Sequence, residues 1–424
     1  MESSMEGWRG WRRRLGMGLL VVSMAVVMAT SVRAADWPQF RGPNRDGKAD
    51  GTGLMKKWPE DGPKLLWRVD DLGHGFTSAA VANGMVYSTG LDGKQGVISA
   101  YDLNGNVKWK KTWGRGWTGA HPGTRATPTI NDGRLYLMSG YGLVVCYNAE
   151  TGQRLWSVDT MKKFGARQIK WGLTENLLIV GDKLIVTPGG EKVSMVALDK
   201  NDGSTIWVCR GAKDKSGYCS PMTVERGGKT IIAQLMSHTF IGVDAKDGRL
   251  LWRKERDPDP AYGIQAVPPV YQDGMFYVTA DYGGERGEGY RLNQDGTDVT
   301  RVWKNGELDC HHGGVIAHRG HVWGSSTRNN RGNWMCLNIR NGNVAAEIRG
   351  VGKGSISWAD GMFYGYGENG LVGLITDDPG NFQMVSSFRI RVGEGPHWAH
   401  PTIAAGRLFI RHGTYLMAYD ISAD

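Results

Sequence analysis

The chain has 424 residues, a formal net charge of +9, 63 glycines and 17 tryptophans. No cluster of Lys and Arg and no basic helical pattern follows residue 34, so the charge is expected on solvated surface and nucleic acid is not expected as a partner. Frequent glycine and tryptophan, without a long helical periodicity, favour many short strands joined by tight turns.

Residues 1–34 are predicted to be a signal peptide. Arg9 and residues 12–14 form a basic start, residues 15–29 form a short apolar core, and residues 32–34 suit cleavage after Ala34. The apolar core is shorter than the roughly 20 residues that a membrane-spanning helix needs, which leaves an uncleaved anchor as the alternative. The region has no cysteine for lipid attachment. We therefore expect a periplasmic or secreted protein with no transmembrane segment in its mature chain.

Residues 35–63 are interpreted as an N-terminal extension, and an internal repeat of about 40–50 residues occupies residues 64–424. The first mark of each copy is a small or acidic residue and Gly before an apolar run, which predicts a tight hairpin turn in which Gly has positive φ. The copies begin at Asn83-Gly84, Asp132-Gly133, Asp273-Gly274, Asp360-Gly361 and Ala405-Gly406, with looser copies at Gly181-Asp182, Gly227-Gly228 and Arg319-Gly320.

A second mark follows each hairpin and approximates Asp-x-x-[Thr/Asp/Asn]-Gly-x-x-x-Trp. It places strands that close the copies at residues 67, 109, 156, 207, 252, 303, 347 and 388. The strand at Trp67 has no hairpin before it, whereas the last copy, from His400 to Ile421, lacks a closing strand. We therefore predict an all-β fold: an eight-bladed β-propeller of four-stranded antiparallel blades, closed by the N-terminal strand that completes the last blade.

The repeated Asp-x-x-Thr/Asp-Gly-x-x-x-Trp element resembles the PQQ-type repeat of quinoprotein alcohol dehydrogenases and of BamB-like propellers. Residues 36–47, with the sequence DWPQFRGPNRDG, resemble the start of many exported bacterial proteins of this PQQ-like family. The resemblance implies that the repeat tryptophans dock each blade against the next one. These structural residues are Trp67, Trp109, Trp156, Trp207, Trp252 and Trp303.

Connections between blades deliver the chain to the innermost strands at one mouth of the central channel, where we expect a binding funnel. Its candidate residues are Arg125, Trp171, Tyr218, Gln265, His311, His312, Lys353, His397 and His400, and Phe76 and Trp398 lie in the same connections. Imidazoles gathered there could bind a metal, transfer protons or, with the cations, hold an anion. Because adjacent strand residues face opposite sides, His311 and His312 are not both expected to face the channel. No spacing is diagnostic of a metal, and none is predicted.

Three classes of function remain open from the sequence, one of which is a hydrolase or lyase that uses the clustered histidines. Another is a monomeric, non-enzymatic module that binds a protein, peptide or saccharide partner in the cell envelope. The alternative, implied by the resemblance, is an alcohol or sugar dehydrogenase that uses PQQ with calcium. The chain has no adjacent pair of cysteines like the one over the quinone in those enzymes, and their calcium-binding Glu, Asn and Asp match no particular positions. We therefore predict no cofactor and favour the binding module.

The five cysteines are an odd number for an oxidising compartment. Bridges between Cys209 and Cys219 and between Cys310 and Cys336 are open alternatives, while Cys146 and Cys336 are interpreted as buried thiols. Residues 293–298 alternate oxygen-bearing side chains around a Gly, as calcium loops do, but they occupy the recurring turn of the repeat, so a turn is the favoured interpretation.

Overall fold

A computed structural model describes residues 36–166, 168–256, 263–281, 286–327 and 330–423. The predicted signal peptide lies outside these residues. Within the described ranges, no helix has the length and apolarity needed to cross a membrane.

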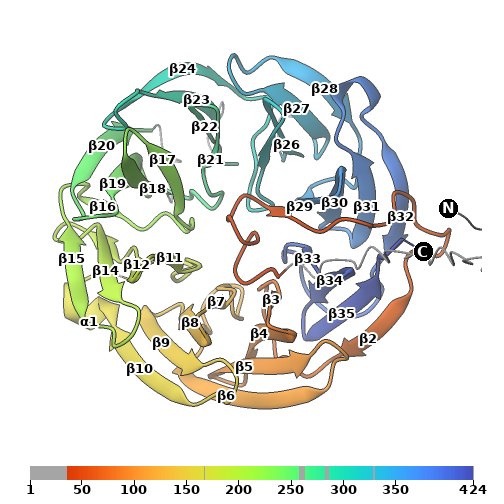
Figure 1. The fold of residues 1–424 in the computed structure, drawn as a ribbon, viewed down its shortest axis with the longest axis horizontal. Helices are drawn as coiled ribbons and strands as arrows, with labels where there is room; N and C mark the ends of the chain where they lie inside the picture. The colour runs from red at the N-terminus through yellow and green to blue at the C-terminus, as the bar shows by residue number, and fades with distance from the viewer. Residues whose placement is uncertain (1–35, 167, 257–262, 282–285, 328–329, 424) are drawn as a thin grey trace, which may run out of the picture. The chain divides into compact units, whose positions relative to one another are not determined.

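Eight four-stranded antiparallel sheets stand around a common centre (Figure 1), which confirms the predicted eight-bladed propeller. The first four blades, each from its inner to its outer strand, are β3 (Ala80–Ala82), β4 (Met85–Asp92), β5 (Gln95–Asp102), β6 (Val107–Arg115); β7 (Thr129–Asn131), β8 (Arg134–Met138), β9 (Leu143–Asn148), β10 (Arg154–Asp159); β11 (Leu178–Val180), β12 (Lys183–Val186), β14 (Met195–Asp199), β15 (Thr205–Cys209); and β17 (Met222–Arg226), β18 (Lys229–Leu235), β19 (Thr239–Asp244), β20 (Leu250–Glu255).

The second half of the ring repeats this order. Its blades are β21 (Val270–Gln272), β22 (Met275–Val278), β23 (Gly287–Leu292), β24 (Val299–Asn305); β25 (Ile316–His318), β26 (His321–Ser325), β27 (Trp334–Asn338), β28 (Val344–Ile348); β29 (Gly354–Ala359), β30 (Met362–Gly367), β31 (Leu371–Thr376), β32 (Met384–Arg389); and β33 (Thr402–Ala404), β34 (Arg407–His412), β35 (Tyr415–Asp420), β2 (Leu65–Val69). In the eighth blade β2 pairs antiparallel with β35, with Trp67 opposite Ala418.

Besides β1 (Lys48–Ala49), four short elements lie outside the blades. They are α1 (Thr160–Phe164), the 3-10 helix η1 (Pro379–Asn381), and the paired strands β13 (Gly189–Gly190) and β16 (Asp214–Lys215). Asp159 caps α1 by accepting from the backbone N–H of Lys162, and Gly165 ends the helix in a left-handed conformation.

The first sequence mark forms the turn between the two inner strands of a blade. Asn83 and Gly84 have φ of 53° and 75°, and Asp132 and Gly133 have φ of 48° and 69°. Positive φ at both central residues defines a type I′ turn, which matches the right-handed twist of the strands it joins. The left-handed conformation therefore extends to the residue before Gly, where Asn and Asp tolerate it best.

The second mark forms contacts between neighbouring blades. The indole Nε1 of Trp109 donates to the carbonyl of Ala149, at 3.0 Å, in the outer turn of the next blade. A Cβ on Gly152 in that turn would lie 2.7 Å from the Trp109 ring, so glycine is what allows the close approach. The same donation runs from Trp67 to Leu103, Trp156 to Lys200, Trp207 to Ala245 and Trp303 to Ile339.

Trp252 joins its neighbour differently. Its ring packs against Phe240 of its own blade and Phe276 of the next, with centroids 6.0 and 6.1 Å away. Its Nε1 has no hydrogen-bond partner among the described residues, and the corresponding turn glycine, Gly296, faces Ile231 instead. The Trp252 contact itself is apolar, and the polar contacts across this junction come from other residues, such as Arg226 to the Asn293 carbonyl and Lys254 to Asp298.

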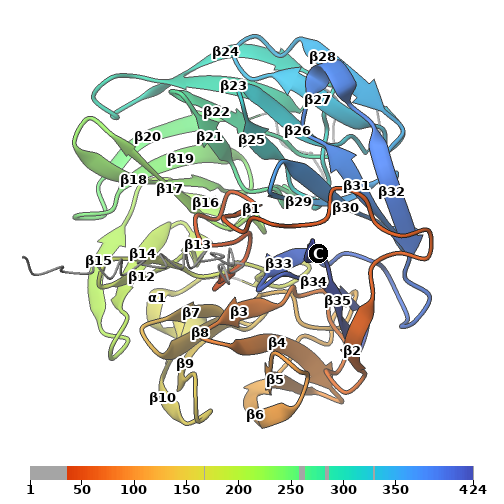
Figure 2. The same ribbon diagram turned by 45° about the vertical axis from the view of Figure 1, so that its right-hand side comes forward.

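The N-terminal extension crosses the centre of the ring (Figures 1 and 2). Trp37 bridges to Val81 in the first blade, and Pro38 accepts from Ile130 in the second. Beyond it, β1 (Lys48–Ala49) pairs in parallel with β29 of the seventh blade. The segment thus contacts blades on both sides of the channel.

Two arginines fix this segment. Arg45 donates to the carbonyls of Asn176, Leu177 and Pro221 at 2.8–3.0 Å, at the entries to the third and fourth blades. Arg41 donates to the carbonyl of Val315, at the entry to the sixth. Both side chains are buried, and both residues have positive φ. The DWPQFRGPNRDG sequence is therefore a central plug, which we define as residues 36–49.

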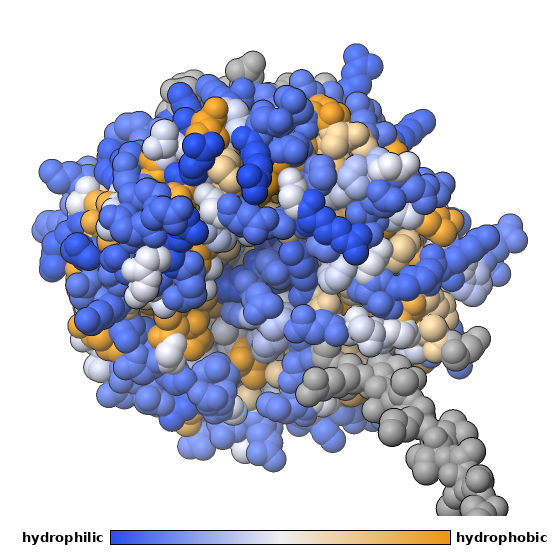
Figure 3. Space-filling model, turned by 45° about the horizontal axis from the view of Figure 1, so that its top comes forward, coloured by the Kyte–Doolittle hydropathy of each residue, from blue (hydrophilic) through white to orange (hydrophobic). Residues whose placement is uncertain are grey.

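Exposed large apolar side chains are spread around the rim of the ring. They lie on the outermost strands of seven blades: Leu65, Val107, Leu155, Ile206, Val302, Val344 and Met384. The face in Figure 3 is mostly hydrophilic, with apolar groups scattered among polar ones. Single exposed apolar residues of this kind are ordinary on protein surfaces.

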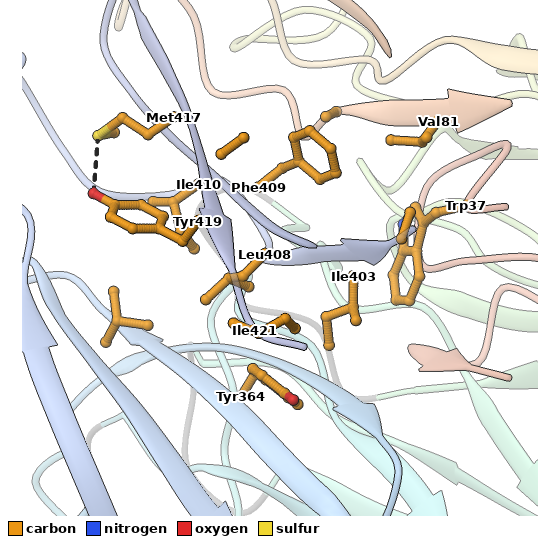
Figure 4. Close-up of a cluster of buried hydrophobic side chains, with 14 of the residues drawn as sticks. Trp37, Val81, Tyr364, Ile403, Leu408, Phe409, Ile410, Met417, Tyr419 and Ile421 are labelled. Carbon is orange, nitrogen blue, oxygen red and sulfur yellow. Dashed lines mark hydrogen bonds between the residues drawn. The ribbon is translucent and has the colours of Figure 1, made fainter. Parts of the chain in front are cut away.

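The apolar core is divided among the spaces between blades. One cluster joins the plug, the first blade and the last two blades, with Trp37 beside Val81 and Ile403 (Figure 4). Trp37 is buried, as are Leu408 and Tyr364 in the same cluster. Because each blade buries its faces only against its neighbours, the ring and its plug depend on each other for burial.

All five cysteines are free and buried, so neither candidate disulfide forms. Cys209 and Cys219 belong to different core clusters, and so do Cys310 and Cys336. Burial raises the pKa of Cys146 to about 11, and the buried-thiol interpretation holds for all five residues.

Residues 293–298 form a turn, as predicted. Asn293 Oδ1 accepts from the backbone N–H groups of Thr297 and Asp298, and Asp295 Oδ1 accepts from the Thr297 hydroxyl. The side-chain oxygens therefore stabilise the turn itself.

Candidate functional site

A cavity of about 290 Å³ opens at one mouth of the channel. Its walls come from the plug and from the segments that join one blade to the next. The lining residues are Phe40, Phe76, His121, Arg125, Trp171, Thr174, Asn176, Tyr218, Ser220, Ile264, Ala266, His311, His312, Trp398 and His400.

Six of the nine residues expected in the funnel line this cavity: Arg125, Trp171, Tyr218, His311, His312 and His400. Gln265 does not, because it is buried and accepts from Arg256 while its neighbours Ile264 and Ala266 face the cavity. Lys353 lies just outside the lining, with Nζ 3.2 Å from His311 Nδ1.

His397 belongs to the packing between the last two blades rather than to the cavity. Its Nδ1 is 2.5 Å from the Tyr366 hydroxyl, and its ring stacks on His412 with centroids 3.5 Å apart. Burial, followed by the neighbouring His412, lowers the pKa of His397 to about 4, so it is neutral at pH 7.

Seven lining residues were not among the sequence candidates, and two of them, Phe40 and His121, carry aromatic or imidazole rings. Phe40 belongs to the plug, and nothing in the sequence placed the extension inside the ring. His121 lies in the same connection as Arg125, so the rule that blade connections converge at one mouth could have included it.

Aromatic rings form most of one wall. The Trp398 ring lies 4.8 Å from Phe76, 5.1 Å from His121 and 5.0 Å from His312, centroid to centroid. Phe40 meets His400 edge to face at 4.9 Å. Such tilted contacts are favourable for ring quadrupoles and fix the faces that a ligand would meet.

Arg125 is the residue of fixed positive charge among the described lining residues. Its Nη2 donates to the carbonyls of Ala120 and His121, at 3.0 and 2.7 Å, and its guanidinium lies 5.9 Å from the Phe76 ring. Burial lowers its pKa to about 10, so it remains a cation at neutral pH.

His400 is a neutral hydrogen-bond donor in the cavity wall. Its Nε2 lies 3.0 Å from the carbonyl oxygen of His312; because a carbonyl only accepts, Nε2 carries the proton. Burial, reinforced by the charge of Arg41, lowers the pKa of His400 to about 3. The imidazole therefore anchors the His312 backbone without adding charge.

His311 and His312 both line the cavity, contrary to the expectation that they face opposite sides. The reason is local: the two residues lie in a bend, and β25 begins only at Ile316. Their rings are 4.4 Å apart, and His312 Nε2 lies 3.2 Å from Oε1 of Glu368, in the turn between β30 and β31. Burial alone would raise the pKa of Glu368, but His312 and Lys353 lower it below its usual value.

The donor set does not fit a calcium–quinone centre. Calcium prefers six to eight oxygen ligands, including carboxylates, and no described lining residue is Asp or Glu. The side-chain oxygen of Asn176 accepts from the Thr127 N–H at 2.6 Å, and the Thr174 hydroxyl donates to the Tyr218 carbonyl, so these polar groups already have partners in the protein.

The fold and site define a plugged eight-bladed propeller with an aromatic cavity at one mouth. A family model described as outer membrane protein assembly factor BamB matches residues 94–347, more than half of the chain. The chain therefore belongs to this family of PQQ-like repeat propellers.

Curated relatives include dehydrogenases. Quinoprotein alcohol dehydrogenase PedH of Pseudomonas putida is 27% identical over 242 residues, which cover 54% of this chain and 38% of that protein. A quinoprotein ethanol dehydrogenase of Pseudomonas aeruginosa is 30% identical over 153 residues, which cover 35% of this chain and 23% of that enzyme. The chain thus spans well under half the length of these relatives.

Solved structures share the fold at low identity. BamB from Moraxella catarrhalis superposes with a TM-score of 0.62 at 16% identity, covering 84% of this chain and 99% of that one. Quinohemoprotein alcohol dehydrogenase from Comamonas testosteroni superposes with a TM-score of 0.65 at 12% identity, covering 92% of this chain and 81% of that one. A BamB structure and a dehydrogenase structure therefore both share this fold.

Proposed function

We propose that this protein is an exported, non-enzymatic binding module of the cell envelope, whose cavity takes part of a protein, peptide or saccharide partner. The observation that carries the proposal is the lining: aromatic and imidazole rings surround one arginine, with no carboxylate among the described residues. The family's description as an outer-membrane assembly factor supports an envelope location and a protein partner.

The cavity suits a chain end or one protruding group rather than a whole partner. Its volume, about 290 Å³, lies at the lower limit of ligand pockets. Trp398 and Phe76 offer apolar ring faces to an aromatic side chain or a sugar ring, and Arg125 offers a charge-assisted donor to a carboxylate. The scattered apolar groups on the face in Figure 3 give no broad alternative surface there.

The dehydrogenase alternative is supported by the names of the curated relatives. A dehydrogenase of this kind requires a quinone, a calcium ion and a carboxylate base. The described lining supplies no Asp or Glu to bind the calcium or to act as the base. The binding module is therefore the proposal that the geometry favours.

The test uses purified, tag-free protein against arrays of peptides and oligosaccharides, followed by calorimetry on each hit. The proposal expects at least one ligand whose affinity falls about tenfold or more in Trp398→Ala and in Arg125→Ala, because each removes a central contact. Arg391→Ala is the matched control, since Arg391 is exposed and outside the cavity. Ligands that bind all three variants equally would remove the cavity as the site.

The alternative is tested in parallel. PQQ and calcium are added with an artificial electron acceptor and a panel of alcohols and sugars. Stoichiometric quinone binding together with substrate-dependent reduction of the dye would replace the proposed function with the dehydrogenase.

A further inference from the structure

A second cluster of chemically active groups lies at the edge of the cavity. His311 and His312, before the sixth blade, and Glu368, in the seventh, each present one ligand-type atom, and these three atoms lie within 4.8 Å of one another. The side chains of His312 and Glu368 are 22% and 26% exposed, so a small ion can reach them.

The spacing is close to that of a coordination shell. Tetrahedral zinc holds nitrogen and oxygen ligands at about 2.0–2.1 Å, which places ligand atoms about 3.3 Å apart. His312 Nε2 and Glu368 Oε1 are already 3.2 Å apart, and the third atom is within reach of a side-chain rotation. Two imidazoles and one carboxylate are a ligand set that zinc uses when it keeps a fourth position open.

The backbone around the histidines is held in place. The His311 N–H donates to the Thr327 hydroxyl at 3.1 Å, and the His312 carbonyl accepts from His400 Nε2 at 3.0 Å. The other ring nitrogen of His312, Nδ1, is buried without a hydrogen-bond partner among the described residues. The segment is thus fixed while the imidazole keeps coordinating capacity.

Lys353 occupies the position that a cation would take. Its ammonium lies 3.2 Å from His311 Nδ1 and 3.4 Å from Glu368 Oε1, so it contacts two of the three groups. The Lys353 side chain is 31% exposed, so its long stem can carry the ammonium out to solvent. A bound dication and this ammonium would repel each other, so the two compete for one place.

We propose that His311, His312 and Glu368 bind a divalent transition-metal ion of the zinc class, with Lys353 as the cation that holds the empty site. Both imidazoles line the cavity, so the open fourth position faces it and takes water or an oxygen of the cavity ligand. This site goes beyond the proposed function and does not require it. The sequence could not show it, because Glu368 lies far from the histidines along the chain.

The experiment titrates metal-stripped, tag-free protein with Zn²⁺ by calorimetry and with Co²⁺ by visible absorption, whose bands report nitrogen and oxygen ligation. We expect one equivalent to bind. Glu368→Gln, which keeps the side-chain shape, should weaken binding at least tenfold, and the double change His311→Ala with His312→Ala should abolish it. Lys353→Met should tighten binding about fivefold, because the competing charge is removed.

His321→Ala is the control, since His321 lies in the same blade but outside the cluster. Far-ultraviolet circular dichroism and melting curves establish that each variant folds. Lack of stoichiometric binding to the native protein would overturn the proposal, and so would binding that Glu368→Gln and the double variant leave unchanged. A Lys353→Met variant that binds no tighter would remove the placeholder role.

Discussion

Replacing Arg45 with Met tests whether the plug stabilises the ring. Arg45 donates to three backbone carbonyls, of Asn176, Leu177 and Pro221, and Nη1 also donates to Gln39 Oε1 at 3.1 Å. Methionine fills a similar space but leaves those buried carbonyls without this donor.

The magnitude follows from two opposing terms. The Leu177 carbonyl keeps the Thr129 hydroxyl as a donor, at 2.7 Å, so two buried carbonyls are left unsatisfied. Each costs about 1–3 kcal/mol, or about 2–6 kcal/mol for the two. The variant also no longer buries a charge. Burial lowers the pKa of Arg45 to about 10, which corresponds to a relieved penalty of about 3 kcal/mol. The two terms leave an expected net loss of about 1 kcal/mol in the free energy of unfolding.

Urea denaturation followed by tryptophan fluorescence measures this loss. Arg391→Met, at an exposed arginine outside the plug, provides the matched control and should change the unfolding free energy by less than about 0.5 kcal/mol. A loss for Arg45→Met no larger than that for Arg391→Met would refute the reasoning, because it would mean that the plug contributes little to holding the third and fourth blades.

Three further outcomes are expected. Gly152→Ala should destabilise the protein by about 1–3 kcal/mol more than Gly133→Ala. Both glycines have nearly the same φ, 68° and 69°, but of the two Gly152 alone contacts the Trp109 ring. Equal losses of stability in thermal unfolding would contradict docking through this glycine. The pKa of His400 is lowered to about 3 in the folded state, so the neutral imidazole stabilises the fold fully above about pH 6.5 and this contribution is lost as the pH falls. Between pH 7 and pH 5 the unfolding free energy of the wild type should fall by about 2 kcal/mol more than that of His400→Gln. An equal fall in both proteins, measured by denaturation at the two pH values, would exclude this. The buried thiols should resist a thiol reagent at pH 7.5 and react, five per chain, only in denaturant; rapid labelling of the native protein would argue against the buried-thiol interpretation.

The fold could be predicted because two short sequence patterns recur along the chain. Each Asn-Gly or Asp-Gly pair sets a type I′ turn by backbone sterics, and every outer-strand tryptophan of the repeat except Trp252 faces a turn glycine of the next blade, as Trp109 faces Gly152. The turn pair is local, whereas a tryptophan and its glycine lie one repeat apart, so both patterns recur with the repeat and set the blade count.

The site was predictable only in part. The rule that blade connections meet at one mouth found His311, His312 and Arg125, because it needs only the position of each connection. It misplaced His397, whose ring turns into the packing between the last two blades, and it assumed a strand where His311 and His312 lie in a bend. Side-chain direction in irregular backbone follows from packing, which the sequence pattern does not encode.

The sequence by itself determined the number of blades, the turns between their strands and the residues that join neighbouring blades, since these rest on φ preferences and on contacts that recur with the repeat. Only the tertiary structure decided that residues 36–49 fill the centre of the ring, that Phe40 lines the cavity, and that Glu368 meets His312. Those contacts join distant parts of the chain once each, and closing the ring is what brings them together.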